Sequence, residues 1–358
     1  MVKTILLNPG PVTLSEGVRV AAMAADLCHR EPEFLDLQSQ VIAGLLAVYG
    51  CDPATWRAVT LGGSGTSAME AMLCSLLPGG ARLLVLENGV YGERLARIAA
   101  VHGIDCVSLR QPWGAAIDLD AVAAQLESGG FTHLAMVHHE TTTGRLNPVE
   151  AVADLCARHG LRLLLDAVSS FGAEAIPFEH PALEACAGTA NKCLHGIPGL
   201  AFVLCRAAAL GGGLRRSLSL HLPDWADRQQ AGSTPYTPAV NAVLALRQAL
   251  RELAAQGGWQ ARRARYLELA DAVRACLAKL GVEPWLPAAD SSCVLRSYRL
   301  PEGVDYNTVH AALKRDGFII YEGQGGLARE MFRISTMGDI GDDDLVRLQT
   351  SLASVFGG

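Results

Sequence analysis

Residues 161–205 read LRLLLDAVSSFGAEAIPFEHPALEACAGTANKCLHGIPGLAFVLC. The segment opens with an apolar run that ends in an acid, Asp166, and it closes with a second apolar run, GLAFVLC, at 199–205. Runs that are apolar at every position are typical of strands covered on both faces of a sheet. Between the two runs, Lys192 stands among small residues and turn formers. We therefore predict two buried strands that bring an aspartate and a lysine into one site.

Similar apolar runs alternate with helical patterns on the N-terminal side of this segment. The predicted strands cover 58–63, 81–89, 105–110, 132–140, 161–169 and 199–205. The predicted helices between them cover 66–77, 91–102, 118–127 and 148–159. This alternation predicts an α/β fold with a doubly wound, mostly parallel sheet between helices and right-handed crossovers.

The two flanks of this region have a different character. The Pro-Gly-Pro sequence at 9–11 cannot lie inside a helix, so the N-terminus is predicted to be an extended arm. After about residue 235, long helical patterns and short strand-like runs are typical of a small α+β domain. The predicted parts are an arm at 1–16, a large domain at 17–240 and a small C-terminal domain at 241–358. Helices are predicted at 238–256 and 259–280, and the domain boundary is expected within a long helix near 240–265 that bridges the two domains.

Composition excludes several classes of protein. The net charge of −6 over 358 residues argues against a dedicated nucleic-acid binder and gives no basic face for a membrane. The ten cysteines are scattered without a C-x-x-C pair, which favours buried thiols in a reducing compartment. No run approaches the roughly 20 apolar residues of a spanning helix. The N-terminal apolar stretch is too short to be a signal peptide, so we expect a cytoplasmic location.

Asp166 and Lys192 together indicate pyridoxal phosphate chemistry. A lysine amine bonds to the aldehyde of that cofactor, and a carboxylate keeps its pyridine nitrogen protonated. An acid that ends an apolar run is costly unless it meets a cation or a strong donor. Alone, Asp166 could instead cap the following segment, and Lys192 could be a surface lysine in a loop.

Other polar groups follow predicted strand ends, where open α/β sheets bind ligands. The glycines, amides and hydroxyls of GGSGTS at 62–67 suit a phosphate, although a plain turn is the alternative. Tyr91 could cover one face of a planar ring or be an ordinary surface tyrosine. HHETTTG at 138–144 ends a strand with an acid and three hydroxyls. Because His138 and His139 are adjacent on a strand and point to opposite faces, we expect no metal.

The order of these features along the chain is the one found in fold-type I pyridoxal phosphate enzymes: a phosphate turn, an aromatic residue, a polar strand end, an aspartate and a lysine. Over nearly its whole length the chain resembles the class V aminotransferases. The resemblance is carried by LLNPGPV, GSGTSAMEAML, NGVYGERL, HHETTTGRLNPV, DAVSSFG and, most specifically, TANKCLHGIPGLAFV at 189–203. It implies the fold-type I architecture, the cofactor pyridoxal 5'-phosphate and a homodimer with shared active sites.

The resemblance also implies a role for individual residues. Lys192 and Asp166 would be catalytic, the first by moving a proton between the substrate and cofactor carbons and the second by pairing with the pyridine nitrogen. The implied cofactor contacts are Ser64, Gly65, Thr66, Tyr91, Thr142, Val168 and Asn191, with Tyr236 and Thr237 supplied by a second subunit. The implied substrate contacts are Arg333, Asn8, Pro9 and Gly10. Arg333 would bind a carboxylate, although a surface arginine is the alternative, and we add the hypothesis that Arg30 or His29 meets a phosphonate dianion.

The wording ETTTG and Asn-Lys-Cys is nearest to the branch of the family that moves the amino group of 2-aminoethylphosphonate to pyruvate, which gives phosphonoacetaldehyde and L-alanine. Two departures leave the donor open: His-Arg at 29–30, as in the alanine:glyoxylate branch, and Gln324, where a basic residue is common. Alternative donors are alanine, serine or phosphonoalanine, with glyoxylate or pyruvate as acceptor. A pyridoxal phosphate lyase acting on a related aminophosphonate, or a non-catalytic α/β binding protein, are further alternatives.

Overall fold

Seven strands form the large sheet, in the order β2-β10-β9-β8-β5-β3-β4. In chain order they are β2 (Trp56–Gly63), β3 (Arg82–Glu87), β4 (Asp105–Arg110), β5 (His133–Val137), β8 (Arg162–Asp166), β9 (Leu183–Thr189) and β10 (Gly199–Arg206). Only β10 runs antiparallel to its neighbours β2 and β9. The predicted mostly parallel α/β sheet is therefore confirmed in this computed structural model, which describes residues 3–24 and 26–357. The extreme ends of the predicted arm and C-terminal domain lie outside that range.

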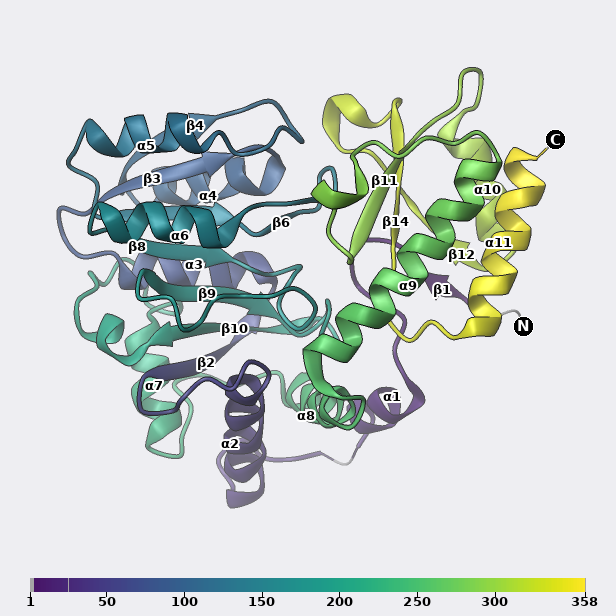
Figure 1. The fold of residues 1–358 in the computed structure, drawn as a ribbon. Helices are drawn as coiled ribbons and strands as arrows, with labels where there is room; N and C mark the ends of the chain where they lie inside the picture. Colours follow the sequence, from purple (N-terminus) through teal and green to yellow (C-terminus); the bar gives the residue numbers. More distant parts are fainter. Residues whose placement is uncertain (1–2, 25, 358) are drawn as a thin grey trace.

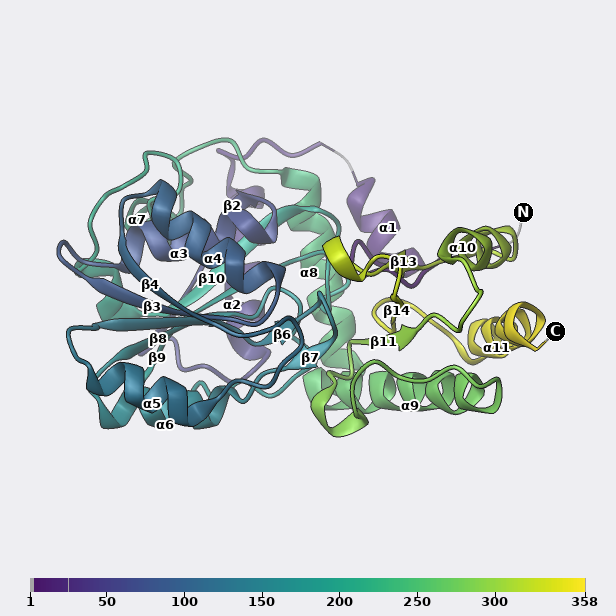
Figure 2. The same ribbon diagram turned by 90° about the horizontal axis from the view of Figure 1, so that it is seen from above.

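Helices cover both faces of the sheet, as the edge-on view in Figure 2 shows. One face packs against α2 (Pro32–Ala47), α5 (Leu119–Glu127), α6 (Val149–Arg158) and α8 (Val240–Ala255). The other face packs against α3 (Gly65–Leu76), α4 (Val90–Val101) and α7 (Leu222–Gln230). The interior positions of the central strands β3, β5 and β8 are apolar throughout because both faces of these strands are buried. The predicted helices at 66–77, 91–102, 118–127 and 148–159 are confirmed to within a residue or two at most ends.

Two features of the sheet differ from the prediction. Strand β9, with the sequence LEACAGT, was missed because its small residues lack the branched and aromatic side chains that mark a strand. The predicted strand at 132–140 ends early, at Val137, and His139–Glu140 (β6) leaves the sheet to pair with Arg145–Leu146 (β7). Gly144 closes this hairpin at a φ of 88°, which glycine adopts readily.

The C-terminal part contains a three-stranded antiparallel sheet, β11-β14-β13, beside long helices (Figure 1). Its elements are α9 (Gly258–Lys279), β11 (Leu295–Arg299), α10 (Tyr306–Arg315), β12 (Phe318–Ile319), β13 (Tyr321–Glu322), β14 (Met331–Ser335) and α11 (Asp342–Phe356). The two predicted helices at 238–256 and 259–280 are confirmed as α8 and α9, and Gly257, at a φ of 99°, separates them. Helix α8 packs against the large sheet, whereas α9 packs against α11. The chain therefore passes from the large sheet to the C-terminal part at this glycine.

The N-terminal arm joins the two parts of the molecule. Ile5–Leu6 (β1) pairs in parallel with β12 of the C-terminal part. The arm then leads to α1 (Glu16–Ala22), which packs on α8 (Figure 1). Ser15 begins α1 by accepting a hydrogen bond from the Val18 amide. No helix within the described residues is long and apolar enough to cross a membrane.

Candidate active site

Asp166 and Lys192 lie at the carboxyl edge of the large sheet. Asp166 is the last residue of β8, and Lys192 follows the end of the neighbouring parallel strand β9 by three residues. The carboxyl ends of adjacent parallel strands meet at one edge of a sheet, where ligands bind in open α/β folds. The side-chain charges are close enough to influence each other, because Lys192 lowers the pKa of Asp166.

The Asp166 carboxylate is buried with little compensation. It is 3% exposed, and its Oδ1 accepts one hydrogen bond, of 2.9 Å, from the Val168 amide. Burial raises the pKa of Asp166 to about 7, and the nearby charge of Glu140 adds to the rise. Oδ2 has no hydrogen-bond partner within the described residues. A carboxylate in this state is prepared to pair with a cationic ring nitrogen.

Lys192 is largely buried, and burial lowers its pKa to about 8. The predicted arm covers it, since a Cβ atom built on Gly10 would lie 2.8 Å from Lys192 Nζ and 2.6 Å from its Cδ. Asn8 is buried and donates from Nδ2 to the Pro11 carbonyl oxygen, which holds the arm in its turn. Asn191, beside the lysine, accepts a hydrogen bond of 2.8 Å from the Thr189 hydroxyl.

Gly10→Ala is expected to lower kcat/KM by about tenfold, because the new methyl group displaces Lys192. Gly50→Ala is the matched control, because Gly10 and Gly50 both have a positive φ. At Gly50, where φ is 67°, there is open space around the position of the new methyl group. Steady-state kinetics and thermal unfolding of both variants separate lysine displacement from backbone strain. Wild-type kcat/KM in Gly10→Ala would show that the arm's approach to Lys192 is unimportant.

The predicted phosphate turn begins helix α3. Ser64 is the N-cap, and the amides of Gly65 and Thr66 start the helix, whose N-terminus attracts anions. A Cβ on Gly65 would lie 2.4 Å from Cγ1 of Val168, so the turn fits closely against the segment after Asp166. The structure thus brings Ser64, Gly65, Thr66 and Val168 together beside the Asp166 carboxylate, and their contacts with a phosphate and a ring stay predictions.

Arg94 is a residue of this site that sequence reasoning missed. Its Nη1 donates a 2.9 Å hydrogen bond to the Thr66 hydroxyl, and its guanidinium lies 4.5 Å from the centre of the Tyr91 ring. Its charge lowers the pKa of both Asp166 and Lys192. The spacing from Tyr91, three residues along α4, was the available signal, because residues at that spacing share a helix face.

Glu140 fixes the hairpin against helix α4. Its Oε2 accepts from the amides of Tyr91 and Gly92, at 3.2 and 3.3 Å, and burial raises its pKa. The Thr142 hydroxyl is also engaged, since it donates to Glu140 Oε1 at 2.5 Å and accepts from the Val90 amide at 3.0 Å. The predicted contact of Thr142 with the cofactor therefore stays a prediction. The neighbouring hydroxyl of Thr141 has no hydrogen-bond partner within the described residues.

Arg333 reaches the site from β14 of the C-terminal part. It is 3% exposed, and its Nη1 and Nε donate to the carbonyl oxygens of Thr141 and Glu322, at 2.8 and 2.9 Å. No carboxylate pairs with it within the described residues, and burial lowers its pKa. A buried guanidinium held only by neutral groups is a binding site for an anion.

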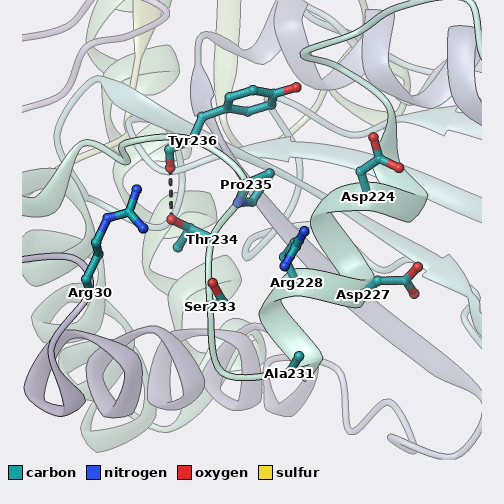
Figure 3. Close-up of a pocket in the computed structure, with 9 residues that line it drawn as sticks. All are labelled: Arg30, Asp224, Asp227, Arg228, Ala231, Ser233, Thr234, Pro235 and Tyr236. Atoms are coloured by element: carbon teal, nitrogen blue, oxygen red, sulfur yellow. Dashed lines mark hydrogen bonds between the residues drawn. The ribbon is translucent and has the colours of Figure 1, made fainter.

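Arg30 and Tyr236 lie together elsewhere on the surface. Both line a cavity of about 760 Å³ beside the turn at 233–236, whereas Lys192 and Arg333 do not (Figure 3). Tyr236 is 37% exposed, its hydroxyl donates to the Leu218 carbonyl oxygen, and Thr237 is exposed as well. Within one chain, the structure therefore does not bring Arg30 to the lysine site.

Residues 59–336 match the sequence profile of the family described as aminotransferase class-V. The chain belongs to the class-V aminotransferases. It is 38% identical, over 94% of this chain and 90% of the relative, to a 2-aminoethylphosphonate–pyruvate transaminase of Aeromonas hydrophila. A protein of the same name from Phocaeicola vulgatus is 34% identical, over 98% of each chain. The fold resembles the aspartate aminotransferase of Thermus thermophilus, with a TM-score of 0.90 and 28% identity over 98% of this chain and 99% of the other.

Class-V aminotransferases use pyridoxal phosphate, and the residues of this site fit that cofactor. Asp166, which is 3% exposed, offers for the pyridine nitrogen an oxygen, Oδ2, that has no hydrogen-bond partner within the described residues. The start of α3, with Arg94 beside it, offers amides and positive charge for the phosphate. Lys192 offers an amine whose lowered pKa makes it a better nucleophile near neutral pH.

Proposed function

We propose that this aminotransferase transfers the amino group of 2-aminoethylphosphonate to pyruvate, which gives phosphonoacetaldehyde and L-alanine. The proposal rests chiefly on the agreement of relatives bearing that name, which are 34–38% identical to the chain. Each of these three covers at least 94% of this chain, so both parts of the site lie within the matched length. A cytoplasmic location is proposed with it, as predicted from the composition.

When bound, the cofactor supplies an aldehyde that accepts the amino group and a ring that stores the electron pair released at the donor carbon. With the cofactor bound, neutral Lys192 Nζ would take the proton from the amine-bearing carbon of the donor and would carry it to the cofactor side. Asp166 would hold a proton on the pyridine nitrogen through its charge, which would keep the ring able to accept electrons. Release of phosphonoacetaldehyde would consume one water, and uptake of pyruvate would return one, with the proton transfer by Lys192 running in reverse.

The remaining site residues bind and orient. Ser64, Gly65 and Thr66 hold the cofactor phosphate, with Arg94 as additional positive charge. Tyr91 covers the ring, and Thr142 is kept as the proposed contact of a further cofactor oxygen. Val168 and Asn191 remain proposed contacts of the cofactor. The proposed contacts of the substrate still include Asn8, Pro9 and Gly10.

The test of the donor is a panel of amines with pyruvate as acceptor. We expect 2-aminoethylphosphonate to give the highest kcat/KM, above alanine and serine, with alanine assayed against glyoxylate. Phosphonoacetaldehyde and L-alanine should appear in equal amounts. A higher kcat/KM for serine, or for alanine with glyoxylate, would replace the proposed donor while leaving the transamination chemistry in place.

Arg333→Lys is expected to raise the KM for pyruvate by about tenfold or more, because lysine cannot form the bidentate pair with a carboxylate. The charge is retained, so the loss reports geometry. Arg329→Lys is the matched control, since Arg329 is exposed on the segment before β14. An unchanged KM for pyruvate in Arg333→Lys would mean that Arg333 does not bind the carboxylate of pyruvate.

We further propose a homodimer in which Tyr236 and Thr237 complete the phosphate site of the partner. Tyr236 and its neighbour Leu218, which is 72% exposed, leave large apolar side chains exposed at this turn. Such exposure supports the proposal that a second subunit packs there. Arg30, which shares the Tyr236 cavity, would then lie toward the partner's site.

The dimer is tested by complementation between two impaired subunits, Lys192→Ala and Tyr236→Ala. If the sites are shared, a mixed dimer has one site with both wild-type residues, so mixing restores up to about a quarter of the activity per total subunit. Co-expression with two affinity tags isolates the mixed dimer for assay. Activity no greater than that of the separate variants would mean that each site lies within one chain.

A further inference from the structure

His195 has an unusual backbone conformation in the turn that carries Lys192. Its φ is 64°, and it is the one non-glycine residue with positive φ in the part of the chain that the structure describes. Such residues are uncommon and persist where the surrounding structure holds them. The His195 amide donates to the Lys192 carbonyl oxygen at 2.9 Å, so this conformation belongs to the lysine turn itself.

The side chain of His195 fastens the turn to two other segments. Its Nε2 accepts a 3.0 Å hydrogen bond from the Gly338 amide and another from the Tyr266 hydroxyl of α9. The planes of the His195 and Tyr266 rings are inclined by 25°, with centroids 6.1 Å apart, so the two rings lie nearly end to end along the hydrogen bond. A backbone amide can only donate, so Nε2 is the unprotonated nitrogen of a neutral ring. Burial beside Arg262 lowers the pKa of His195 well below its usual value, which keeps the ring in this form.

Helix α9 holds the same turn at a second point. Arg262, which is 4% exposed, donates from Nη1 to the Cys193 carbonyl oxygen at 2.7 Å. Arg262 and Tyr266 are four residues apart, so one face of α9 holds the residues on both sides of Leu194. Gly338 in turn forms a β-bridge with Thr13 of the arm, and Gly10 of that arm lies against Lys192. The lysine turn, α9 and the arm therefore meet at His195.

We propose that His195 is a positioning residue, which ties the turn at 190–196 to α9 and to the Gly338 turn and thereby sets where Lys192 Nζ lies. The proposal rests on the proposed function, because it takes Lys192 as the lysine that binds the cofactor. Lys192 must reach both the donor carbon and the cofactor carbon, so a small displacement of the turn slows proton transfer. The C-terminal part, through α9, thus contributes to the placement of a residue on the large sheet.

The test compares His195→Asn with His195→Gln. Asparagine tolerates positive φ but is too short to reach Gly338 and Tyr266, whereas glutamine is longer and carries an acceptor oxygen. For His195→Asn we expect kcat to fall about tenfold and the KM for pyruvate to change less than about twofold. The pH midpoint of the visible absorbance of the lysine-bound cofactor should rise by about one unit, since a loosened Lys192 is better hydrated. In His195→Gln, both kcat and the pH midpoint of the absorbance should return at least part of the way to their wild-type values.

His310→Asn, on helix α10, is the control for the same substitution away from the turn. If His195→Asn keeps the wild-type spectral midpoint and kcat, the proposal is wrong, whatever the thermal stability of the variant. If His195→Asn does not fold, Tyr266→Phe decides by the same two readings, because it removes one of the two donors to Nε2.

Borohydride reduction of the wild-type holoenzyme, followed by peptide mapping, keeps the two proposals apart. A label on a residue other than Lys192 would end the assignment of the lysine, on which the positioning role depends, whereas the donor panel tests the proposed reaction itself. A label on Lys192 together with an unaffected His195→Asn variant would end only the positioning role of His195.

Discussion

Lys192→Ala is expected to lower kcat by about 10⁴-fold or more and to abolish the visible absorbance of lysine-bound cofactor. The sequence contains four lysines, at positions 3, 192, 279 and 314. Lys192 alone stands at the carboxyl edge of the large sheet; Lys3 pairs with Asp344, and the other two lie in helices α9 and α10. No other lysine amine can therefore replace it in the proton transfer.

Lys314→Ala is the control, because it removes a lysine from an outer helix. Absorbance spectra, borohydride labelling and single-turnover rates with 2-aminoethylphosphonate should be measured on both variants. Small amines added to Lys192→Ala should restore part of the rate by taking the proton in place of Nζ. A borohydride label retained in Lys192→Ala would contradict the assignment.

Asp166→Asn is expected to lower kcat by about 10² to 10³-fold, because asparagine carries no charge to hold the proton on the pyridine nitrogen. Asp166→Glu is the matched control for charge, since it keeps the carboxylate and changes its reach. Steady-state rates with saturating cofactor measure the effect of the charge. A kcat for Asp166→Asn within a few-fold of wild type would mean that the ring nitrogen has another partner.

The same substitution should stabilise the cofactor-free protein at high pH. Burial raises the pKa of Asp166 to about 7, from an ordinary value of 3.8. Between these two values the folded chain holds a proton that the unfolded chain has lost, so stability falls as the pH rises through this window. Asparagine does not titrate and escapes this loss. Above pH 7, urea unfolding of the apoprotein should therefore give Asp166→Asn a larger free energy of unfolding than wild type, by at most about 4 kcal/mol. This difference should vanish below about pH 4.

The trade between stability and function at Asp166 has a physical basis. A carboxylate with one hydrogen bond in a buried site destabilises the empty protein, and the protonated ring supplies the missing partner when the cofactor binds. Cofactor binding should consequently lower the pKa of Asp166 and raise the thermal midpoint of the wild type more than that of Asp166→Asn.

The strands were predictable where their residues are large and apolar. Runs such as LRLLLD specify burial on both faces, and their polar ends then mark the edge where Asp166 lies. Strand β9 was not predictable in this way, because Ala, Cys and Gly give neither a strand pattern nor a helix pattern. The hairpin at 139–146 was missed for a related reason, since its two-residue strands are too short to show alternation.

The sequence by itself determined the α/β architecture, the family and the placement of Asp166 and Lys192 at one edge of the sheet, because burial and strand-end polarity follow from local patterns of residues. The tertiary structure alone decided which distant segments meet those two residues. It brought Arg94 to Thr66, Gly10 to Lys192, and His195 to Gly338 and Tyr266. It also placed Arg30 beside Tyr236, away from the lysine. Such contacts depend on how whole elements pack, which no local pattern of residues specifies.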